Sequence, residues 1–379
     1  MSPFKIGFVG PDQTQPCGVA DYTSRLGEAL AAKCDLVFVP FREALASPAL
    51  GECRAILVQY ERSLVSGPGF LPALSARHPG KVFVVPHEVY AEDPYAFPYA
   101  DLRSAFPPFL WAKRLRYRWR HRAYAREKRL QARGYGAHRV IPLSGPGADI
   151  LRGLSGADPA RILDPVPHAF FDPPASLGAA KIKRTDFFPH EIRSIIGIFG
   201  FLNPGLDYAS ALDLLADLDA ATGLLILGGP RPGARRVADA GDGASGSAKG
   251  HGSVDVWLAG EVAGRGLGGR VRVTGYVPEA TLADHLRLCD IFLAPLRFKS
   301  NSGSLLHLIH AGKPILAADL PLTRWLREQG APLELYAGAR ELVPLAKAAL
   351  ARGSQLFAGR YPWSFPAVAD AYLRVLSRG

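Results

Sequence analysis

The sequence predicts an α/β protein with two domains, each built on a parallel sheet that helices cover. Three observations carry this prediction. The chain has 379 residues, too many for one hydrophobic core. Short apolar runs alternate with helical or loop stretches in two separate series, which is typical of parallel sheets. The segment 171–191 between the series is rich in proline, alanine and charge, as interdomain linkers are. We therefore place one domain at 1–180 and a second at 190–362.

The first series opens on the apolar run 5–9, which predicts a buried strand, and continues through a loop at 10–18 that contains proline and glycine. A helix is expected over about 19–32, where Leu26 and Leu30 share one face. The loop lacks the G-x-G-x-x-G spacing of a dinucleotide fingerprint, so NAD binding is not predicted. Further strands are predicted at 36–39, 55–58, 82–85 and 140–143.

Polar side chains follow two of these strands, at the edge where open parallel sheets bind ligands. Glu61 ends the sequence VQYE, and His87 and Glu88 end the sequence PHE. His87 is a candidate general base or a group that orients a substrate hydroxyl, although an isolated histidine is more often a satisfied structural residue. Glu61 and Glu88 are candidate contacts to an acceptor substrate. The alternative for each is a surface salt bridge.

The second series predicts strands at 194–199, 224–227, 271–274, 291–294 and 314–317, and helices at 207–220, 279–288 and 303–311. The segment 230–252 contains few apolar residues and many glycines and alanines, so we predict a surface loop there. A last helix is predicted at 365–376, with Ala367, Ala371, Tyr372 and Val375 packed against another element.

A candidate anion site lies in the loop 297–304, between a predicted strand and a predicted helix. A glycine-containing loop in this position directs backbone N–H groups and the positive end of the helix dipole at one spot. Two serine hydroxyls and two cations add to this environment, which suits a phosphate or diphosphate. The alternative is that Ser302 caps the helix and the loop merely happens to be basic. The candidate residues are Arg297, Lys299, Ser302, Gly303 and Ser304.

The composition is that of a globular protein, with 48% hydrophobic and 21% charged residues. Its four cysteines, at 17, 34, 53 and 289, have neither metal-ligand spacing nor a secreted disulfide framework, so we expect a reducing, cytoplasmic setting. The N-terminal sequence leads directly into a strand, so no signal peptide is expected. No apolar run is long enough to span a membrane.

Positive charge is concentrated at 113–133. The formal net charge is +11, and this segment contributes ten basic residues minus Glu127, or +9. Basic residues interleaved with Trp and Tyr suit an anionic membrane surface, where each cation contributes about 1 kcal/mol. This interpretation predicts peripheral contact with the inner face of the membrane; the alternative is a solvated helix. Nucleic acid is also attracted to such a segment, but the nearly neutral remainder argues against a general polyanion-binding protein.

Several stretches together resemble the retaining glycosyltransferases of family 4. They are KIGFVGPDQTQPCGVADYTSRLGEAL, VQYE at 58–61, PHE at 86–88, IGIFGFLNPGLDYASAL at the start of the second series, and VRVTGYVPEATLADHLRLCDIFLAPLRFKSNSGSLLHLIHAGKPILA. The resemblance covers nearly the whole chain. It implies the GT-B fold, in which two Rossmann-like domains with parallel sheets face each other across a cleft. It also implies that the C-terminal segment 363–379 packs back on the first domain.

The same resemblance implies roles for individual residues. A nucleotide-sugar donor would bind mainly to the second domain and the acceptor to the first. His87 would hydrogen-bond a hydroxyl of the transferred sugar. The remaining donor contacts would be Gly18, Ser302, Gly303 and Ser304 to the diphosphate, Tyr276 and Val277 beside the base, and His307 near the ribose.

The chain departs from the family pattern in two places. Many members have a Glu-x7-Glu pair where this sequence has Lys299 and His307. Many also have an Arg and a Lys after the first strand of the second domain, where this sequence reads GFLNPG at 200–205. We hypothesise that Arg297 and Lys299 replace those cations, because a leaving diphosphate needs its developing charge stabilised and such enzymes generally work without a metal.

Three functions therefore follow from the sequence. The first is retaining transfer of a sugar from a nucleotide sugar to a saccharide or lipid-linked acceptor, without a further cofactor. In this family the leaving phosphate oxygen is usually described as helping to deprotonate the acceptor, so no protein nucleophile is required. The second is epimerisation of a nucleotide sugar. The third is a non-catalytic homologue that acts as a partner or scaffold, and the two departures are its main support.

Overall fold

The chain is described by a computed structural model, which covers residues 4–12, 18–61, 64–65, 69–87, 89, 122, 126, 129–131, 133–155, 159–171, 182–203, 205–229, 254–297, 301–309, 311–353 and 361–378. The described residues form two compact units. The first contains the residues before 94 together with 122–170 and those from 362 onward, and the second contains 171–361. Each unit holds one sheet in which every pair of strands is parallel, so the α/β class is confirmed.

The sheet of the first unit has five strands in the order β2-β1-β3-β4-β5. The two strands beside β1 differ in burial: every residue of β3 is buried, whereas β2 is partly exposed at the edge of the sheet. Apolar residues on both faces of β3 and β4 are what a parallel sheet with helices on either side requires. The strands are β1 (Lys5–Gly10), β2 (Asp35–Pro40), β3 (Ala55–Tyr60), β4 (Val82–Pro86) and β5 (Arg139–Val140).

The helices of the first unit include one from the end of the chain. Helix α1 (Gly18–Ala31) buries Leu26 and Leu30, as their spacing predicts. Helix α12 (Phe365–Ser377), which begins at the N-cap Ser364, packs against α1. The other helices of this unit are α2 (Phe41–Ala44), α3 (Phe70–Arg77) and α5 (Gly145–Ser155).

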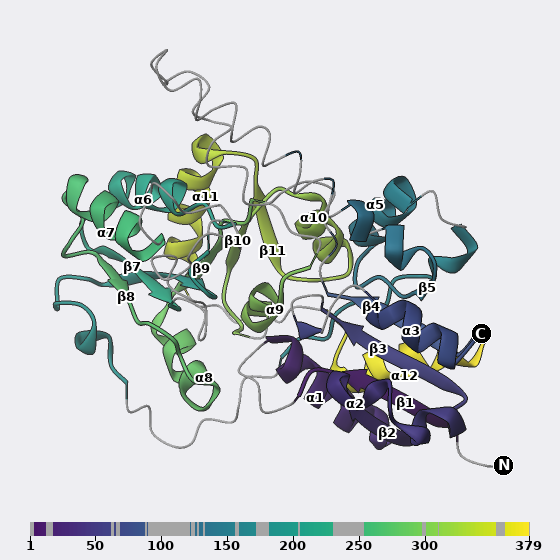
Figure 1. The fold of residues 1–379 in the computed structure, drawn as a ribbon. Coiled ribbons are helices and arrows are strands. Elements are labelled where there is room, and N and C mark those ends of the chain that lie inside the picture. Colours follow the sequence, from purple (N-terminus) through teal and green to yellow (C-terminus); the bar gives the residue numbers. More distant parts are fainter. Residues whose placement is uncertain are drawn as a thin grey trace, which may run out of the picture. The chain divides into compact units, whose positions relative to one another are not determined.

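The sheet of the second unit has six strands in the order β11-β10-β9-β6-β7-β8. Helices α6, α7 and α11 lie on one face, while α8 and α9 lie on the other (Figure 1). The strands are β6 (Ser194–Phe199), β7 (Thr222–Leu227), β8 (Val271–Val273), β9 (Ile291–Ala294), β10 (Ile315–Ala318) and β11 (Leu333–Tyr336). The helices are α6 (Tyr208–Asp217), α7 (Val254–Gly264), α8 (Glu279–Leu288), α9 (Gly303–Ile309), α10 (Pro321–Glu328) and α11 (Ala339–Arg352).

The strand orders locate the ligand-binding edge of each unit. In an open parallel sheet, ligands bind beyond the carboxyl ends of the strands at the point where the strand order reverses direction. In the first unit this point lies between β1 and β3, and in the second it lies between β6 and β9. The loops that follow these four strands contain most of the candidate residues, including Gly18, Glu61 and Ser302.

The predicted elements agree with the structure to within a few residues, with two kinds of difference. The strand predicted at 140–143 is only Arg139–Val140, although the backbone N–H of Ile141 still donates to the Val84 carbonyl at 2.9 Å. The helices α7, α10 and α11 and the strand β11 were not predicted. The segment 230–252 and most of 113–133 lie outside the described residues. Among the residues described, no helix is both long and apolar enough to cross a bilayer.

Candidate functional site

In the second unit, the loops at the carboxyl ends of the strands contain glycines that pack against neighbouring backbone. Gly200 follows β6 with a φ of +132°, and a Cβ added there would lie 3.2 Å from the Cβ of Ser304. A Cβ added at Gly228, after β7, would lie 1.9 Å from the carbonyl oxygen of Gly200. One at Gly229 would lie 3.0 Å from the backbone nitrogen of Tyr276. The loops after β6, β7 and β8 therefore meet through their backbones, a packing that side chains at these positions would prevent.

Hydrogen bonds hold these loops together. The backbone N–H of Gly200 donates to the Leu227 carbonyl at 3.1 Å, and that of Leu202 donates to the Gly229 carbonyl at 2.9 Å. The Gly228 N–H donates to the hydroxyl of Thr274 at 3.2 Å. The floor of this edge is thus rigid backbone, placed next to the loop that contains Ser304.

The serine loop begins α9. Ser302 is buried, and its hydroxyl accepts a hydrogen bond of 3.4 Å from the Leu305 N–H, which is the capping geometry. Its Oγ also lies 3.3 Å from the Oγ of Ser304. The cap is therefore present, and the second hydroxyl lies beside it next to Gly200. Lys299 lies outside the described residues.

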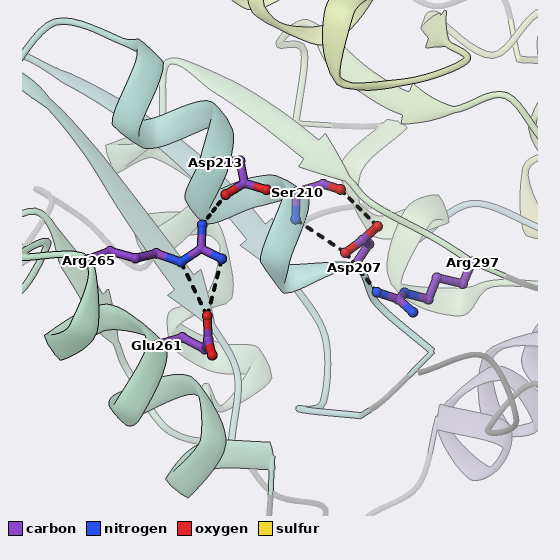
Figure 2. Close-up of polar contacts among 6 residues, drawn as sticks. All are labelled: Asp207, Ser210, Asp213, Glu261, Arg265 and Arg297. Carbon is purple, nitrogen blue, oxygen red and sulfur yellow. Dashed lines mark hydrogen bonds and ion pairs between the residues drawn. The ribbon is translucent and has the colours of Figure 1, made fainter. Parts of the chain in front are cut away.

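Arg297 is held in an ion pair. Its Nη2 donates to Oδ1 of Asp207 at 2.9 Å, and the Arg297 side chain is 16% exposed (Figure 2). Asp207 also caps α6 by accepting hydrogen bonds from the N–H and hydroxyl of Ser210. Burial opposes ionisation of Asp207, but the hydrogen bonds from Arg297 and Ser210 outweigh it and lower the pKa of the carboxyl. The pair joins the strand end at Arg297 to α6.

A second ion-pair cluster lies farther along α6. Arg265 donates to Glu261 on α7 at 3.1 Å and also to Asp213 on α6 (Figure 2). These contacts link α7 to α6 and involve none of the candidate residues. We regard them as structural, and exposed pairs of this kind stabilise by about 1 kcal/mol or less.

Aromatic rings line the same edge. The side chain of Tyr276 is 53% exposed, and its ring is nearly parallel to that of Phe201, with centroids 6.3 Å apart and an interplanar angle of 12°. Val277 is buried next to it. Phe201 stands in the stretch where the family pattern that the sequence resembles has a cation, and this chain has an aromatic ring there.

His307 lies between two phenylalanines. Its ring stacks on Phe171 at 3.9 Å with an interplanar angle of 5°, and it meets Phe199 edge to face at 5.3 Å. These two contacts involve the ring surface of the imidazole and fix its orientation. The polar atoms of the side chain are its two ring nitrogens. The ring is thus fixed by packing, and the ribose contact expected for it stays a prediction.

In the first unit, His87 follows β4 and is buried. Its Nε2 lies 2.9 Å from Oε1 of Gln59 on β3, and its backbone N–H donates to the Tyr60 carbonyl at 3.0 Å. Burial, together with a smaller effect of the nearby His168, lowers the pKa of His87 to about 3. The imidazole is therefore neutral at physiological pH.

The other candidates of this unit are placed at the same edge. Gly18 is exposed and begins α1, and nothing lies within 4 Å of where its Cβ would stand. Glu61 is 6% exposed at the end of β3, and its carbonyl accepts a hydrogen bond from Leu64. Glu88 lies outside the described residues. In the part of the chain that is described, no cluster of three or more His, Cys, Asp or Glu side chains is arranged to hold a metal ion.

Comparisons with known proteins agree with this architecture. A profile of the family described as glycosyl transferases group 1 matches residues 240–351. HepE of Anabaena, solved in complex with UDP-glucose, has a TM-score of 0.65 and 14% sequence identity over 99% of this chain and 100% of its own. Sucrose-phosphate synthase of Thermosynechococcus elongatus has a TM-score of 0.63 and 13% identity over 99% of this chain and 100% of its own. The fold is GT-B. WaaG, a glycosyltransferase involved in lipopolysaccharide biosynthesis, has a TM-score of 0.53 and 12% identity, with coverage of 99% and 100%.

The identities are low, so these likenesses establish the GT-B architecture alone. Comparison of the sequence with curated proteins finds no significant match. The expectation of two Rossmann-like units is confirmed, whereas the roles of single residues stay predictions.

Sequence reasoning missed several residues that shape the two GT-B edges. Gly228 and Gly229 follow a predicted strand as a Gly-Gly pair, and that pair was the available signal for close backbone contact. Asp207 was the first residue of a predicted helix, where an acidic N-cap is common, but nothing local indicated its pairing with Arg297. Gln59 and His168 are far from His87 in the sequence, and only the folded structure brings their side chains close to it.

Proposed function

We propose that the protein is a retaining glycosyltransferase of family 4 that moves a sugar from a nucleotide sugar to a saccharide or lipid-linked acceptor. The observation that carries the proposal is the edge of the second unit, where Ser304 adjoins the glycine-built floor at the reversal of strand order. The floor lets an anion approach the backbone closely, and the two serine hydroxyls supply donors. The group 1 profile and the UDP-glucose complex of a protein with the same fold support this choice of ligand.

In this proposal the donor is recognised in three parts. The diphosphate contacts Ser302, Gly303 and Ser304, and Gly18 keeps the diphosphate role that the family resemblance implies. The base lies beside Tyr276, whose exposed ring offers a stacking face. His307, Val277 and the acceptor-side Glu61 and Glu88 keep the roles that the family resemblance implies.

His87 acts in this scheme as a neutral hydrogen-bonding group. A pKa of about 3 makes the imidazole too weak a base to remove a proton from an acceptor hydroxyl at neutral pH. It therefore orients a hydroxyl of the transferred sugar. Deprotonation of the acceptor falls to the leaving phosphate oxygen, and retention of configuration needs no protein nucleophile.

The cation roles are divided between two side chains. Arg297 is tied to Asp207, so part of its charge is offset and the guanidinium is held in place. We propose that Lys299 supplies the positive charge that stabilises the leaving diphosphate and that Arg297 adds to the positive field.

Nucleotide binding is the decisive measurement. We expect a panel of nucleoside diphosphates to contain at least one that raises the melting temperature of the full chain, because a ligand at 100 times its Kd stabilises by about 2.7 kcal/mol. Product analysis with the corresponding nucleotide sugars then separates transfer from epimerisation. The absence of a shift with every base contradicts the enzyme and favours a non-catalytic scaffold.

Two variants test whether Lys299 and Arg297 contribute to nucleotide binding. Lys299→Ala is expected to weaken nucleotide binding by about tenfold, which corresponds to about 1.4 kcal/mol. Arg297→Ala is expected to weaken binding and also to lower the unfolding free energy by about 1–3 kcal/mol, since it leaves Asp207 partly buried without its partner. Unchanged affinity and turnover in Lys299→Ala argues against its role.

We also propose that the basic segment binds an anionic membrane surface. Its described part is helical at Arg122, Arg126, Arg129 and Arg133, which are exposed and spaced i, i+4, i+7 and i+11 along one face. Liposomes with anionic lipid are expected to carry the protein in flotation at low salt, and binding should weaken at high salt. Substitution of these four arginines by glutamine is the matched variant and should reduce binding at least tenfold. No flotation at low salt rejects the proposal.

A further inference from the structure

A buried polar cluster surrounds His87 in the first unit. Its five side chains come from five separate segments, and none is more than 8% exposed. Hydrogen bonds that form in a buried, low-dielectric environment are strengthened, so the contact of His87 with Gln59 holds both side chains in defined orientations. The members are Tyr22 on α1, Gln59 on β3, His87 after β4, His168 after β5 and Tyr372 on α12.

The contact between Gln59 and His87 sets the proton on the imidazole. In the orientation that the structure gives the Gln59 amide, its Oε1 lies 2.9 Å from Nε2 of His87, and because an amide oxygen only accepts hydrogen bonds, Nε2 carries the proton in this arrangement. The ring is neutral, since burial keeps its pKa low. Nδ1 is then the acceptor nitrogen of His87. Within the described residues, no hydrogen bond to Nδ1 occurs.

The ring of His87 is held by packing. Tyr372 is buried near Gln59 and Tyr22, but within the described residues its hydroxyl and the Gln59 Nε2 make no hydrogen bond. The Tyr22 ring meets the His87 ring edge to face at 5.4 Å and lies 3.9 Å from the ring of His168. His168 donates from Nδ1 to the carbonyl of Ala169 at 2.8 Å, so its own tautomer is also fixed. Packing against Tyr22 prevents His87 from rotating away from Gln59.

We propose that Gln59 is a positioning residue that holds His87 as its Nε2–H tautomer and presents Nδ1 as a hydrogen-bond acceptor to a substrate hydroxyl. The inference deepens the proposed function and rests on it for the identity of the hydroxyl, which belongs to the transferred sugar. The tautomer itself does not depend on any substrate.

Nitrogen-15 NMR of the full chain labelled in histidine tests the tautomer without a ligand. The His87 signals are assigned by their loss in His87→Asn. We expect a protonated Nε2 and an unprotonated Nδ1 from about pH 5.5 to about pH 8. In Gln59→Leu the ring should populate both tautomers. A protonated Nδ1 in the natural protein, or an unchanged pattern in Gln59→Leu, overturns the proposal.

Two further variants guard against a merely structural effect. Ser75→Ala removes a similar partner from His138, whose Nδ1 lies 2.9 Å from the Ser75 hydroxyl in the same unit, and should alter His138 but not His87. Gln59→Glu keeps the shape of the side chain and, if Gln59→Leu does not fold, tests the same contact. The carboxylate should raise the pKa of His87 enough to bring its titration into the measured range. A His87 that still does not titrate in Gln59→Glu counts against the contact.

Kinetics then connect the tautomer to the reaction. The amide of Asn occupies the position of Nδ1, and that of Gln occupies the position of Nε2. His87→Asn should therefore keep at least tenfold more kcat than His87→Gln, and Gln59→Leu should lower kcat with little change in the donor KM. The reverse order of the two His87 variants contradicts the role of Nδ1. If the natural protein turns over no nucleotide sugar, the proposed function fails, while the NMR result decides the tautomer independently.

Discussion

Gly228→Ala is expected to abolish nucleotide binding and to lower the unfolding free energy by about 3 kcal/mol or more. The added methyl carbon would lie 1.9 Å from the carbonyl oxygen of Gly200, far inside van der Waals contact. Both atoms belong to backbone at the ends of neighbouring strands β6 and β7, so neither can rotate away as a side chain would. Gly200 must move, and Ser304 is packed against it. The clash is thus transmitted to the proposed diphosphate loop.

The measurement is a denaturant titration together with the nucleotide-induced thermal shift. Gly260→Ala is the matched control, since Gly260 lies in α7 with nothing within 4 Å of its Cβ position. Alanine there should stabilise the helix by up to about 1 kcal/mol. If Gly228→Ala keeps both the stability and the thermal shift of the natural protein, the tight backbone floor is not required for binding.

Strands with an uninterrupted apolar run were predicted from the sequence, whereas β11 and α11, which a charged residue and a proline interrupt, were not. Strands such as β6 and β7 are runs of six residues with apolar centres, and their positions were predicted to within two residues. Strand β11 was missed because Glu334 interrupts its apolar run, whereas β9 and β10, which also have four residues, are apolar throughout and were predicted. Helix α11 was missed as well, and Pro344 inside it is a local signal against a helix. At β11 and α11, packing against neighbouring elements determines the secondary structure.

Some residues of the candidate site could be predicted from the sequence, and their interaction partners could not. Ser302, Ser304 and His87 were chosen as candidates because each lies in the segment that follows a recognisable strand, at the edge where open parallel sheets bind ligands. The pairing of Arg297 with Asp207 spans 90 positions, and the contact of Gln59 with His87 spans 28. Such partners are set by strand order and helix packing, and no local pattern in the sequence contains them. The sequence alone therefore did not show that the Arg297 side chain is held in an ion pair with Asp207.

The second large effect is a loss of stability in mild acid. Burial lowers the pKa of His87 to about 3 and that of His168 to about 4, whereas the unfolded chain has histidines near 6.5. Above about pH 6.5 both states are neutral and the two residues contribute no pH dependence. As the pH falls below that value, the unfolded chain takes up protons first, so the unfolding free energy falls. Each residue should contribute about 1.4 kcal/mol per pH unit until its folded-state pKa is reached.

The difference between the natural protein and His168→Phe isolates one of these contributions. Carboxylates and the other buried histidines titrate in both proteins, so their effects cancel when unfolding free energies are subtracted at each pH. Phenylalanine keeps a ring beside Tyr22, and loss of the hydrogen bond to Ala169 should lower stability by a similar amount at every pH above 6.5. From about pH 6 to about pH 4.5 the variant should therefore lose about 1.4 kcal/mol less per pH unit. Parallel curves would mean that His168 is protonated inside the folded protein, and the neutral surroundings inferred for His87 would then be wrong as well.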